Sequence, residues 1–470
     1  MIWWVRRDLR LADNAALRAC ADSGRPVIPM FVLDMERPRA PGGAGLWWLE
    51  RSLKALAADL EKAGSPLVLR RGPTVETLRA VAAEAGADRL HFGRMYDGED
   101  GGLEDEAAAA LGEAGVEALG HVGSLLTEPG QVKTGSGEAF KVYGPFWRAL
   151  KAQMGPVELT APVRRLRGPD QPVRSEPLKG WKLYPAAPDW AVDFAGEPGE
   201  AGAHRALEAF VHGHVARYQL ERAQPAEAAT SRLSPHLHWG EVSSRQVWTA
   251  ACAAAEARGH EDQREKFLSE LAWRDFSTTV LQSHRHLASE NYLGRLEGLR
   301  WRKDPHGFHA WSRGLTGFPI VDAGMRELWR SGWMHNRVRM ITASFLIKDL
   351  LIDWRMGEQW FWDCLVDADE GNNGINWQWV AGTGPDASPF YRVFTPVGQG
   401  EKFDAGGGYV RRWCPELGKL PNAYVHRPWE APAAVLAEAG VKLGETYPKP
   451  IVDHAEARDR ALAAYRALKA

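Results

Sequence analysis

The stretch RPVIPMFVLD at residues 25–34, followed by LWWLERSLKALAADLEKAG at 46–64 and PLVLRRG at 66–72, decides the fold of the first part of the chain. The first and third segments are short aliphatic runs that predict buried strands, and the second has the periodicity of a helix. The pattern continues with a helix over 74–87 and a strand over 88–97. Alternation of strands and helices at this spacing predicts parallel βαβ units in a doubly wound sheet.

Length and local composition divide the chain into two domains. With 470 residues, the chain is longer than a single hydrophobic core usually supports. We expect an α/β domain at 1–130, a connector rich in proline, glycine and charge at 131–202, and an all-α domain at 203–470. The expected fold class is therefore a doubly wound parallel α/β domain followed by an all-helical domain.

The overall composition narrows the class of protein. A hydrophobic fraction of 45% and a charged fraction of 25% are typical of soluble globular proteins. No run suits a membrane span or a signal peptide, so we expect a cytoplasmic protein without a membrane partner. The net charge of −2 gives no sign of nucleic-acid binding, so DNA contact would need a local positive patch. The cysteines lack any C-x-x-C spacing, which argues against a disulfide framework and a structural zinc site; they are Cys20, Cys252, Cys364 and Cys414.

Two further features of the composition bear on ligands. No G-x-G-x-x-G motif lies between a strand and a helix, so the α/β domain need not bind a dinucleotide. The chain has 21 Trp against 10 Tyr and 15 Phe, which is an unusual order. A large helical core accounts for most of these indoles, and the others are candidates for stacking or redox groups.

A turn in the helical part combines hydroxyl groups with the start of a helix. Tyr218 precedes the turn Thr230-Ser231-Arg232-Leu233-Ser234. Hydroxyls and free N–H groups at a helix N-terminus can cradle a phosphate. Taken alone, a simple helix cap explains the turn better.

Two helical segments place polar and apolar side chains on one face. Glu270, Trp273 and Arg274 have i, i+3, i+4 spacing, so together they can hydrogen-bond a base edge, stack on a base and hold a phosphate. Asn336 and Met340 share a face in the same way, with an amide for a base edge and a thioether for a base face. For the first segment, the alternative is a Trp in the hydrophobic core beside a local Glu–Arg ion pair. For the second segment, the alternative is a solvent-exposed helix N-terminus.

Asp367 and Asp369 lead into a cluster of amides and indoles at 372–379. Paired carboxylates can bind a metal, but no further oxygen ligands follow at suitable spacing, so we expect no metal here. Pairing with Arg339 and with ligand hydroxyls is equally consistent with the pattern.

Together these segments resemble the photolyase/cryptochrome superfamily over nearly the whole chain. Seven segments match in family order, which leaves little room for chance, and in detail the chain is similar to the class III bacterial photolyases. The matching segments are WWVRRDLRLADNAAL, SRLSPHLHWGEVS, LAWRDF, WSRGLTGFPIVDAGMREL, GWMHNRVRMITASFLIKDLLIDWR, DADEGNNGINWQWVAGTGPD and QGEKFD.

The resemblance implies an FAD cofactor in the helical domain. Asn373 matches the position that faces flavin N5, where photolyases carry Asn and plant cryptochromes Asp. A neutral amide tolerates an anionic reduced flavin, whereas an acid would favour protonation. The other positions implied to hold FAD are Tyr218, Thr230, Ser231, Arg232, Leu233, Ser234, Asp367 and Asp369, with Arg339 paired to the acidic side.

The resemblance also implies light-dependent repair of cyclobutane pyrimidine dimers in DNA. Excited reduced flavin would donate one electron to a dimer flipped out of the duplex, and the electron would return after the ring opens. The implied dimer contacts are Glu270 and Asn336 as hydrogen-bond partners, and Trp273, Met340 and Trp379 as apolar walls. The implied DNA contacts, which would form the local positive patch, are Arg222, Arg274, Arg337, Arg392 and Gln399.

Further indoles match chromophore-related positions. Trp377, Trp354 and Trp301 match the family's electron relay, running from the flavin to the surface. A second antenna chromophore is expected, and a folate (methenyltetrahydrofolate) fits class III. The Trp47-Trp48 doublet is a candidate flank for it, although packing in the α/β core is the favoured interpretation.

Three alternatives stay open at this point. A cryptochrome shares fold and flavin, but Asn373 and the dimer-facing set favour repair over light sensing. A (6-4) photolyase should carry a His pair near the lesion, whereas position 339, four residues after His335, is Arg. An electron-transfer flavoprotein or an adenine-nucleotide-binding module would explain only the first domain. We expect a monomer, and the departures from the family pattern at Asp275 and Thr395 bear on the subclass alone.

Overall fold

A parallel sheet forms the centre of the first domain. The computed structural model, which describes residues 1–98, 101–185, 189–257 and 261–468, has five strands in the order β3-β2-β1-β4-β5. β1 lies between β2 and β4, with Ile2 in register with Ile28 and Leu90. The strands are β1 (Ile2–Val5), β2 (Ile28–Leu33), β3 (Val68–Arg71), β4 (Arg89–Gly93) and β5 (Glu117–His121). The predicted strands and their parallel order are confirmed.

Helices cover both faces of this sheet. Successive residues of β1 enter different cores: Trp3 packs with α1 and α2, and Trp4 packs with α3 and α4. This is the alternation expected of a strand that is buried on both sides. The covering helices are α1 (Ala15–Asp22), α2 (Gly43–Ala63), α3 (Thr74–Ala85) and α4 (Leu103–Gly112). The doubly wound arrangement is therefore confirmed.

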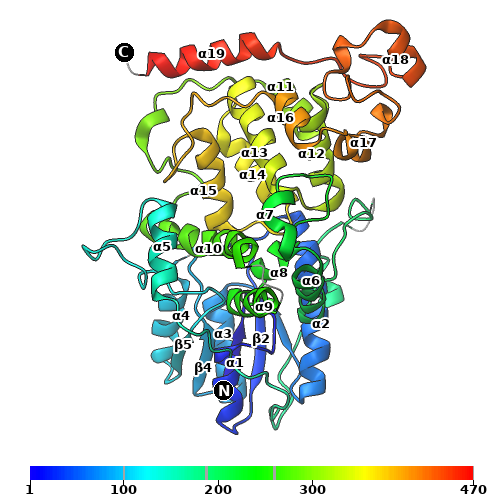
Figure 1. Ribbon diagram of the computed structural model, residues 1–470. Helices are drawn as coiled ribbons and strands as arrows, with labels where there is room; N and C mark the ends of the chain where they lie inside the picture. The colour runs from blue at the N-terminus through cyan, green and yellow to red at the C-terminus, as the bar shows by residue number, and fades with distance from the viewer. Residues whose placement is uncertain (99–100, 186–188, 258–260, 469–470) are drawn as a thin grey trace.

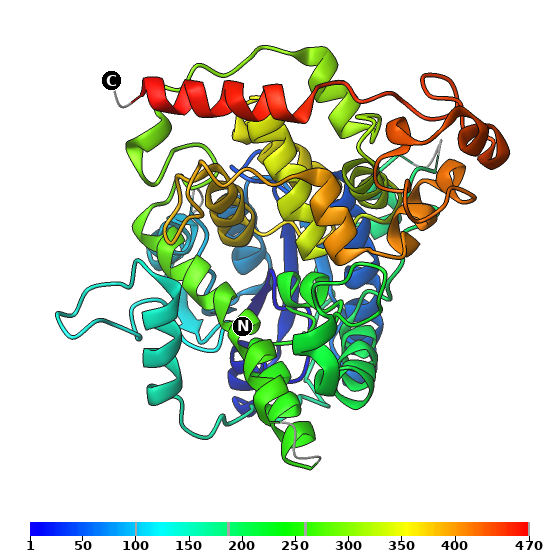
Figure 2. The same cartoon turned by 45° about the horizontal axis from the view of Figure 1, so that its top comes forward.

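The rest of the chain is mostly helical, and most of the helices after residue 260 lie beyond the carboxyl ends of the strands (Figure 1). The connector contributes α5 (Tyr143–Gln153), and α19 crosses the helical domain on the side remote from the sheet (Figure 2). The helices that follow are α6 (Glu200–Gly213), α7 (Tyr218–Glu221), α8 (Ser234–His238), α9 (Ser244–Glu256), α10 (Glu261–Ser283), α11 (Pro305–Ser312), α12 (Pro319–Ser331), α13 (Asn336–Ser344), α14 (Trp354–Cys364), α15 (Glu370–Ala381), α16 (Pro396–Phe403), α17 (Gly408–Trp413), α18 (Ala433–Ala439) and α19 (His454–Ala467).

A buried carboxylate, Asp13, joins the two domains. Its Oδ2 accepts hydrogen bonds from Ser243 Oγ at 2.5 Å and Arg245 Nε at 3.1 Å, and its Oδ1 accepts from Thr160 N at 2.9 Å. Asp13 is 1% exposed, so its charge depends on these partners for compensation. Ser243 is also the N-cap of α9, which fixes the start of this helix to the α/β domain.

Glu241 is a second buried carboxylate at the junction. It accepts hydrogen bonds from Trp48 Nε1 on α2 at 3.2 Å and from Gly199 N at 2.6 Å, and it also bonds to Ser52 and His236. The segment around it passes so close to the first domain that only glycine fits at position 240.

Gly240 has a φ of 65°, and a Cβ there would lie 2.0 Å from the carbonyl oxygen of Arg7. Leu9 N, from the same loop, donates to Trp239 O at 3.2 Å. The helical domain is thus held against the loop that follows β1.

One negative finding concerns membranes. Within the described ranges, no helix combines the length and the apolar character that a bilayer span requires.

We predict that Gly240→Ala lowers the free energy of unfolding by more than about 3 kcal/mol, because the new methyl group overlaps main-chain atoms of Arg7. Gly440→Ala is the matched control: Gly440 has a φ of 73° and open space around it. This control carries only the penalty for a left-handed residue, about 1–2 kcal/mol. Chemical denaturation measures both values, and equal losses would show that the close approach at Gly240 does not matter.

Candidate functional site

A cavity of about 410 Å³ opens in the helical domain between α10, α13 and α15. Its volume lies in the range of about 300–1,000 Å³ that is typical of small-molecule sites. Most of the candidate residues line it, and they come from segments far apart in the chain. The lining candidates are Tyr218, Ser231, Ser234, Glu270, Trp273, Arg274, Asn336, Arg339, Met340, Asp367, Asp369, Asn373, Trp377 and Trp379.

Several candidates do not line this central cavity. Trp301 and Trp354 lie in the hydrophobic core beside it, and Thr230, Arg232 and Leu233 belong to the turn before α8. The remaining candidates outside the lining set are Arg222, Arg337, Arg392 and Gln399.

The turn before α8 contributes only its two serines to the lining. Arg232 has a left-handed φ of 54°, and its guanidinium carbon lies 3.6 Å from the centroid of the Trp333 ring. Leu233 is buried in an apolar cluster. Trp333 donates to Ser234 Oγ at 3.2 Å and lines the cavity itself, a contribution that the sequence did not indicate.

The carboxylate of Glu270 is held by two cations at the cavity. Arg222 approaches Oε2 at 2.9 Å and Lys266, one helical turn before Glu270 on α10, approaches Oε1 at 2.6 Å. Arg222 therefore reaches the site through Glu270. Lys266 was missed, although its i, i+4 spacing to Glu270 is a signal that the sequence contains.

Trp273 is supported from behind by the connector. The ring of Tyr143 on α5 stacks on it with centroids 3.8 Å apart and planes at 13°. Tyr143 also donates to the carbonyl oxygen of Ser269, one turn earlier on α10. Because one face of the indole is covered, only the other face and the edges remain for a ligand in the cavity.

The predicted ion pair between Arg339 and Asp367 forms. Arg339 Nη2 lies 2.8 Å from Asp367 Oδ2, and its Nε donates to the carbonyl oxygen of Met334 at 2.8 Å. The Asp367 side chain is 2% exposed, so the Arg339 guanidinium compensates a buried carboxylate.

Asp369 is the N-cap of α15 and is strongly held in its charged form. It accepts from Asn372 N at 2.9 Å and lies 3.6 Å from His238 and 3.7 Å from Arg274. Burial alone would raise its pKa, but His238, Arg274 and Arg7 together hold the pKa well below its usual range. Among the described residues, no three His, Cys, Asp or Glu side chains gather as a metal site.

The amide of Asn373 has a fixed partner. Its Nδ2 donates to Glu358 Oε1 at 2.8 Å and to the Glu358 carbonyl oxygen at 3.1 Å. Glu358 in turn is paired with Arg39 from the α/β domain. The side chain of Asn373 is therefore oriented by residues outside the cavity.

The relay candidates share one hydrophobic core. Trp377 lines the cavity, Trp354 is fully buried and donates to Asn291 Oδ1 at 3.0 Å, and Trp301 is partly buried at the edge of the same core. Trp377 borders the cavity and Trp301 is the most exposed of the three, and their role as a relay stays a prediction.

The two departures from the family pattern lie away from the cavity lining. Asp275 accepts from Thr127 N at 2.8 Å, and burial raises its pKa to about 7. Thr395 is exposed and precedes α16.

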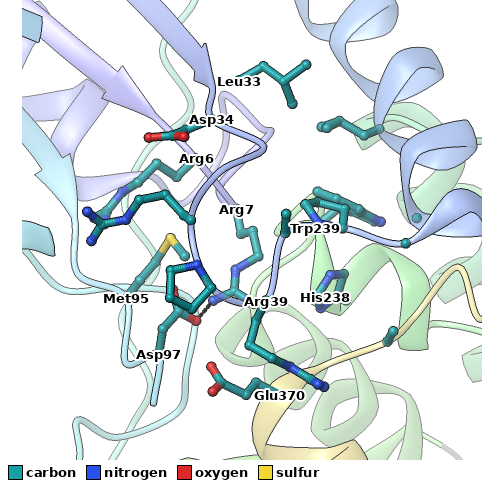
Figure 3. Close-up of a pocket in the computed structure, with 18 of the residues that line it drawn as sticks. Arg6, Arg7, Leu33, Asp34, Arg39, Met95, Asp97, His238, Trp239 and Glu370 are labelled. Carbon is teal, nitrogen blue, oxygen red and sulfur yellow. Dashed lines mark hydrogen bonds and ion pairs between the residues drawn. The ribbon is translucent and has the colours of Figure 1, made fainter. Parts of the chain in front are cut away.

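A second cavity, of about 160 Å³, lies at the carboxyl ends of β1, β2 and β4 (Figure 3). Ligands of doubly wound sheets bind at this edge, where the strand order reverses. Arg6, Arg7 and Arg39 line it together with Trp239, and Arg7 is paired with Asp97.

The Trp47-Trp48 doublet does not line this sheet-edge cavity. Trp47 packs edge-on against Phe194 with centroids 5.1 Å apart, and Trp48 donates to Glu241. Their role in core packing, the favoured interpretation, is confirmed.

We predict that Arg339→Ala lowers the free energy of unfolding by about 3 kcal/mol or more, because Asp367 is left buried without its partner. Arg339→Ala combined with Asp367→Asn should recover most of this loss. Chemical denaturation of the two variants measures the difference. Equal losses would mean that the pair is not the source of the effect.

Known proteins are similar to this chain over its whole length. Residues 1–165 match the family model "DNA photolyase" and 267–467 match "FAD binding domain of DNA photolyase". A deoxyribodipyrimidine photo-lyase from Agrobacterium fabrum is 49% identical, with 100% of this chain and 98% of the relative covered. Cryptochrome-1 of Arabidopsis thaliana is 37% identical over 98% of this chain and 69% of its own length. The crystal structure of a bacterial class III photolyase from Agrobacterium tumefaciens superimposes with a TM-score of 0.97 at 49% identity, covering 100% of this chain and 97% of that one. The chain therefore belongs to the DNA photolyase family, within the photolyase/cryptochrome superfamily.

Proposed function

We propose that this protein repairs cyclobutane pyrimidine dimers in DNA in a light-dependent reaction with FAD as cofactor. The observation that carries the proposal is the composition of the central cavity. Its lining includes indole and thioether side chains with Glu270 and Asn336, and also the Arg339–Asp367 pair with Asn373 and Asp369. The first set of residues suits a pair of pyrimidine bases, and the second set suits a flavin.

The residues of the cavity fit FAD by their donor and acceptor chemistry. The hydroxyls of Ser231 and Ser234, with Tyr218, suit the phosphates and the sugar chain, and Asp369 suits ligand N–H or O–H groups because it stays charged. Arg274 also lines the cavity and lies 3.7 Å from Asp369, so it adds a positive charge to the site.

Bound FAD would supply the light-driven electron that opens the dimer. The protein would bind and orient FAD and the dimer, and it would exclude water from them. Asn373 presents a neutral amide to the cavity, which avoids placing a further negative charge there. Trp377, Trp354 and Trp301 supply a chain of indoles between the cavity and the surface.

The dimer would bind against the indole and thioether walls. Trp273 has one face covered by Tyr143, so its free side can receive a base. Trp379 and Met340 add apolar surface, and Glu270 and Asn336 supply hydrogen-bonding groups for the base edges. Flipping the dimer out of the duplex costs a few kcal/mol, and these contacts offset that cost.

Arginines near the cavity give the local positive charge that the net charge lacks. Arg222 pairs with Glu270 and Arg274 lies near Asp369, and both carboxylates line the cavity. The Arg337 guanidinium lies 4.4 Å from the centroid of the Phe403 ring. Arg392 is exposed. We propose that these arginines and Gln399 contact DNA backbone around the dimer.

Two structural observations weigh on the alternatives. A cryptochrome-like sensor is disfavoured by the amide at Asn373. A (6-4) photolyase is disfavoured because His335 is buried outside the cavity lining, where burial lowers its pKa to about 3 and keeps it neutral.

We further propose that the sheet-edge cavity holds a second, light-collecting chromophore, with a folate as the first choice. Trp239 suits a flat ligand, and four arginines together with Asp34, Asp97 and Glu370 supply polar groups of both signs around it. An absorption spectrum of the pigment released from the purified protein would identify it.

The protein is proposed to act as a monomer in the cytoplasm. The four cysteines are free, three of them buried, which is compatible with a reducing compartment.

We predict that the purified protein with fully reduced FAD restores a dimer-containing oligonucleotide under blue light and not in darkness. Separation of repaired from unrepaired oligonucleotide by chromatography measures the reaction. An oligonucleotide with a (6-4) lesion is the matched substrate control and should stay unrepaired. Repair in darkness, or none under light, would overturn the proposal.

We predict that Glu270→Gln weakens binding of dimer-containing DNA by about 5- to 150-fold, which corresponds to about 1–3 kcal/mol for one base contact, without loss of FAD. Glu265→Gln is the matched control, since Glu265 lies on the same helix and pairs with Lys151 at the surface. Fluorescence titration with labelled DNA measures affinity, and the flavin spectrum measures cofactor content. Loss of FAD from Glu270→Gln would show that this residue contacts the cofactor instead.

A further inference from the structure

Arg39 reaches from the α/β domain to the wall of the central cavity. Its guanidinium pairs with both carboxylate oxygens of Glu358 on α14, with Nη1 and Oε2 at 3.2 Å. Glu358 Oε1 also accepts the amide of Asn373 at 2.8 Å. Arg39 and Asn373 thus bind the same buried carboxylate, which is 2% exposed.

The loop that carries Arg39 is clamped onto α14. The Arg39 guanidinium lies 3.7 Å from the centroid of the Trp362 ring, and Trp362 Nε1 donates to Ala40 O at 2.9 Å. At Gly42, a Cβ would lie 2.5 Å from Asp363 Cα, so the two backbones touch. Arg39 also has a left-handed φ of 58°, which is an uncommon conformation for a residue other than glycine. Arg39 therefore has a fixed position relative to Glu358.

The charge of Glu358 depends on Arg39. Burial raises the pKa of Glu358, and the nearby Glu370 raises it further, whereas Arg39 and the amide of Asn373 lower it. Arg39 is the charged group that favours the ionised form, so its removal would shift Glu358 toward the protonated form.

The charge of Glu358 in turn helps to fix which atom Asn373 presents to the cavity, together with the Glu358 carbonyl oxygen, which accepts from the same Nδ2. An ionised carboxylate only accepts hydrogen bonds, so the NH₂ group of Asn373 must face it and the amide oxygen is left for the cavity. A protonated carboxyl can donate to the amide oxygen, which lowers the cost of the opposite orientation with NH₂ toward the cavity, although that orientation gives up the bond from Nδ2 to the Glu358 carbonyl oxygen at 3.1 Å.

We propose that Arg39 is a positioning residue for the flavin site: through Glu358 it orients Asn373 so that the cavity receives a hydrogen-bond acceptor. The α/β domain thereby helps to set the chemistry of a site in the helical domain. The inference rests on the proposed function only in taking FAD as the ligand next to Asn373.

The test uses Arg39→Met, with Arg51→Met as the matched control. Arg51 lies on α2 of the same domain, and its guanidinium covers Trp47 at 3.9 Å without contacting Glu358. Arg39→Lys is the conservative variant. Each FAD-loaded protein is reduced stepwise with dithionite at several pH values, and the absorption spectrum reports how the reduced flavin takes up protons.

The expected result for Arg39→Met is a fall of about one pH unit in the pH at which the partly reduced flavin loses its proton, because one accepting hydrogen bond of about 1 kcal/mol is lost. Arg51→Met should match the unaltered protein, and Arg39→Lys should lie between the two. An unchanged titration in Arg39→Met would overturn the proposal.

A double-variant cycle separates positioning from general disturbance. In the Glu358→Gln background, Arg39→Met should have little further effect, since the residue through which it acts is already altered. A shift of equal size in both backgrounds would overturn the proposal.

The flavin-free protein gives an independent readout. Without Arg39, a buried Glu358 with a raised pKa should make the midpoint of chemical denaturation fall as pH rises from about 5 to 8, because the folded state then binds the proton more tightly than the unfolded state. This added slope should vanish in Arg39→Met/Glu358→Gln, and its presence there would count against Glu358 as the mediator.

The two proposals can fail separately. Normal flavin titrations with no repair under light would overturn the repair function and leave the role of Arg39 standing. Repair with an unchanged titration in Arg39→Met would do the reverse.

Discussion

The two carboxylates at the domain junction constrain the whole arrangement. Asp13 and Glu241 are buried at 1% and 0% exposure, and each is satisfied only by groups from both sides of the junction. A buried charge that loses its partners is strongly unfavourable, so the helical domain has one low-energy position relative to the sheet. Gly240, next to Glu241, reinforces this position because its main chain packs directly against the main chain of Arg7.

The shape of the central cavity depends on this junction. The segment that carries Glu241 and Ser243 continues directly from Ser231 and Ser234, which line the cavity. Asp369, on another wall, is held charged by His238 of that same segment and by Arg7 of the first domain. A site built from helical-domain side chains is thus oriented by groups that belong to the α/β domain.

The sequence predicts those parts of the structure that depend on local spacing. The strands and covering helices follow from short periodic segments, and Glu270, Trp273 and Arg274 come together because i, i+3 and i+4 positions share a helical face. Candidate groups on different helices were brought to one cavity only through the family resemblance, since spacing says nothing about how helices pack.

The contacts that escaped prediction are those that depend on tertiary packing. Arg232 turns away to Trp333 because its backbone is left-handed, which no pattern of side chains reveals. Tyr143 stacks on Trp273 from a connector that carries few periodic signals. Arg39 and Glu358 are 319 positions apart, and nothing in either neighbourhood marks them as partners.

The pairing of Arg39 with Glu358 determines how an amide or an acid at position 373 affects the charge of the site. An amide there completes the carboxylate with a donor, and Arg39 neutralises the single negative charge. An aspartate at 373 would bring a second carboxyl against a buried one, and two such groups in contact cannot both ionise at low cost. One of them would hold a proton. The choice of amide or acid at position 373 is therefore coupled to residues 39 and 358, and a change at 373 alone alters charge, proton content and side-chain orientation together.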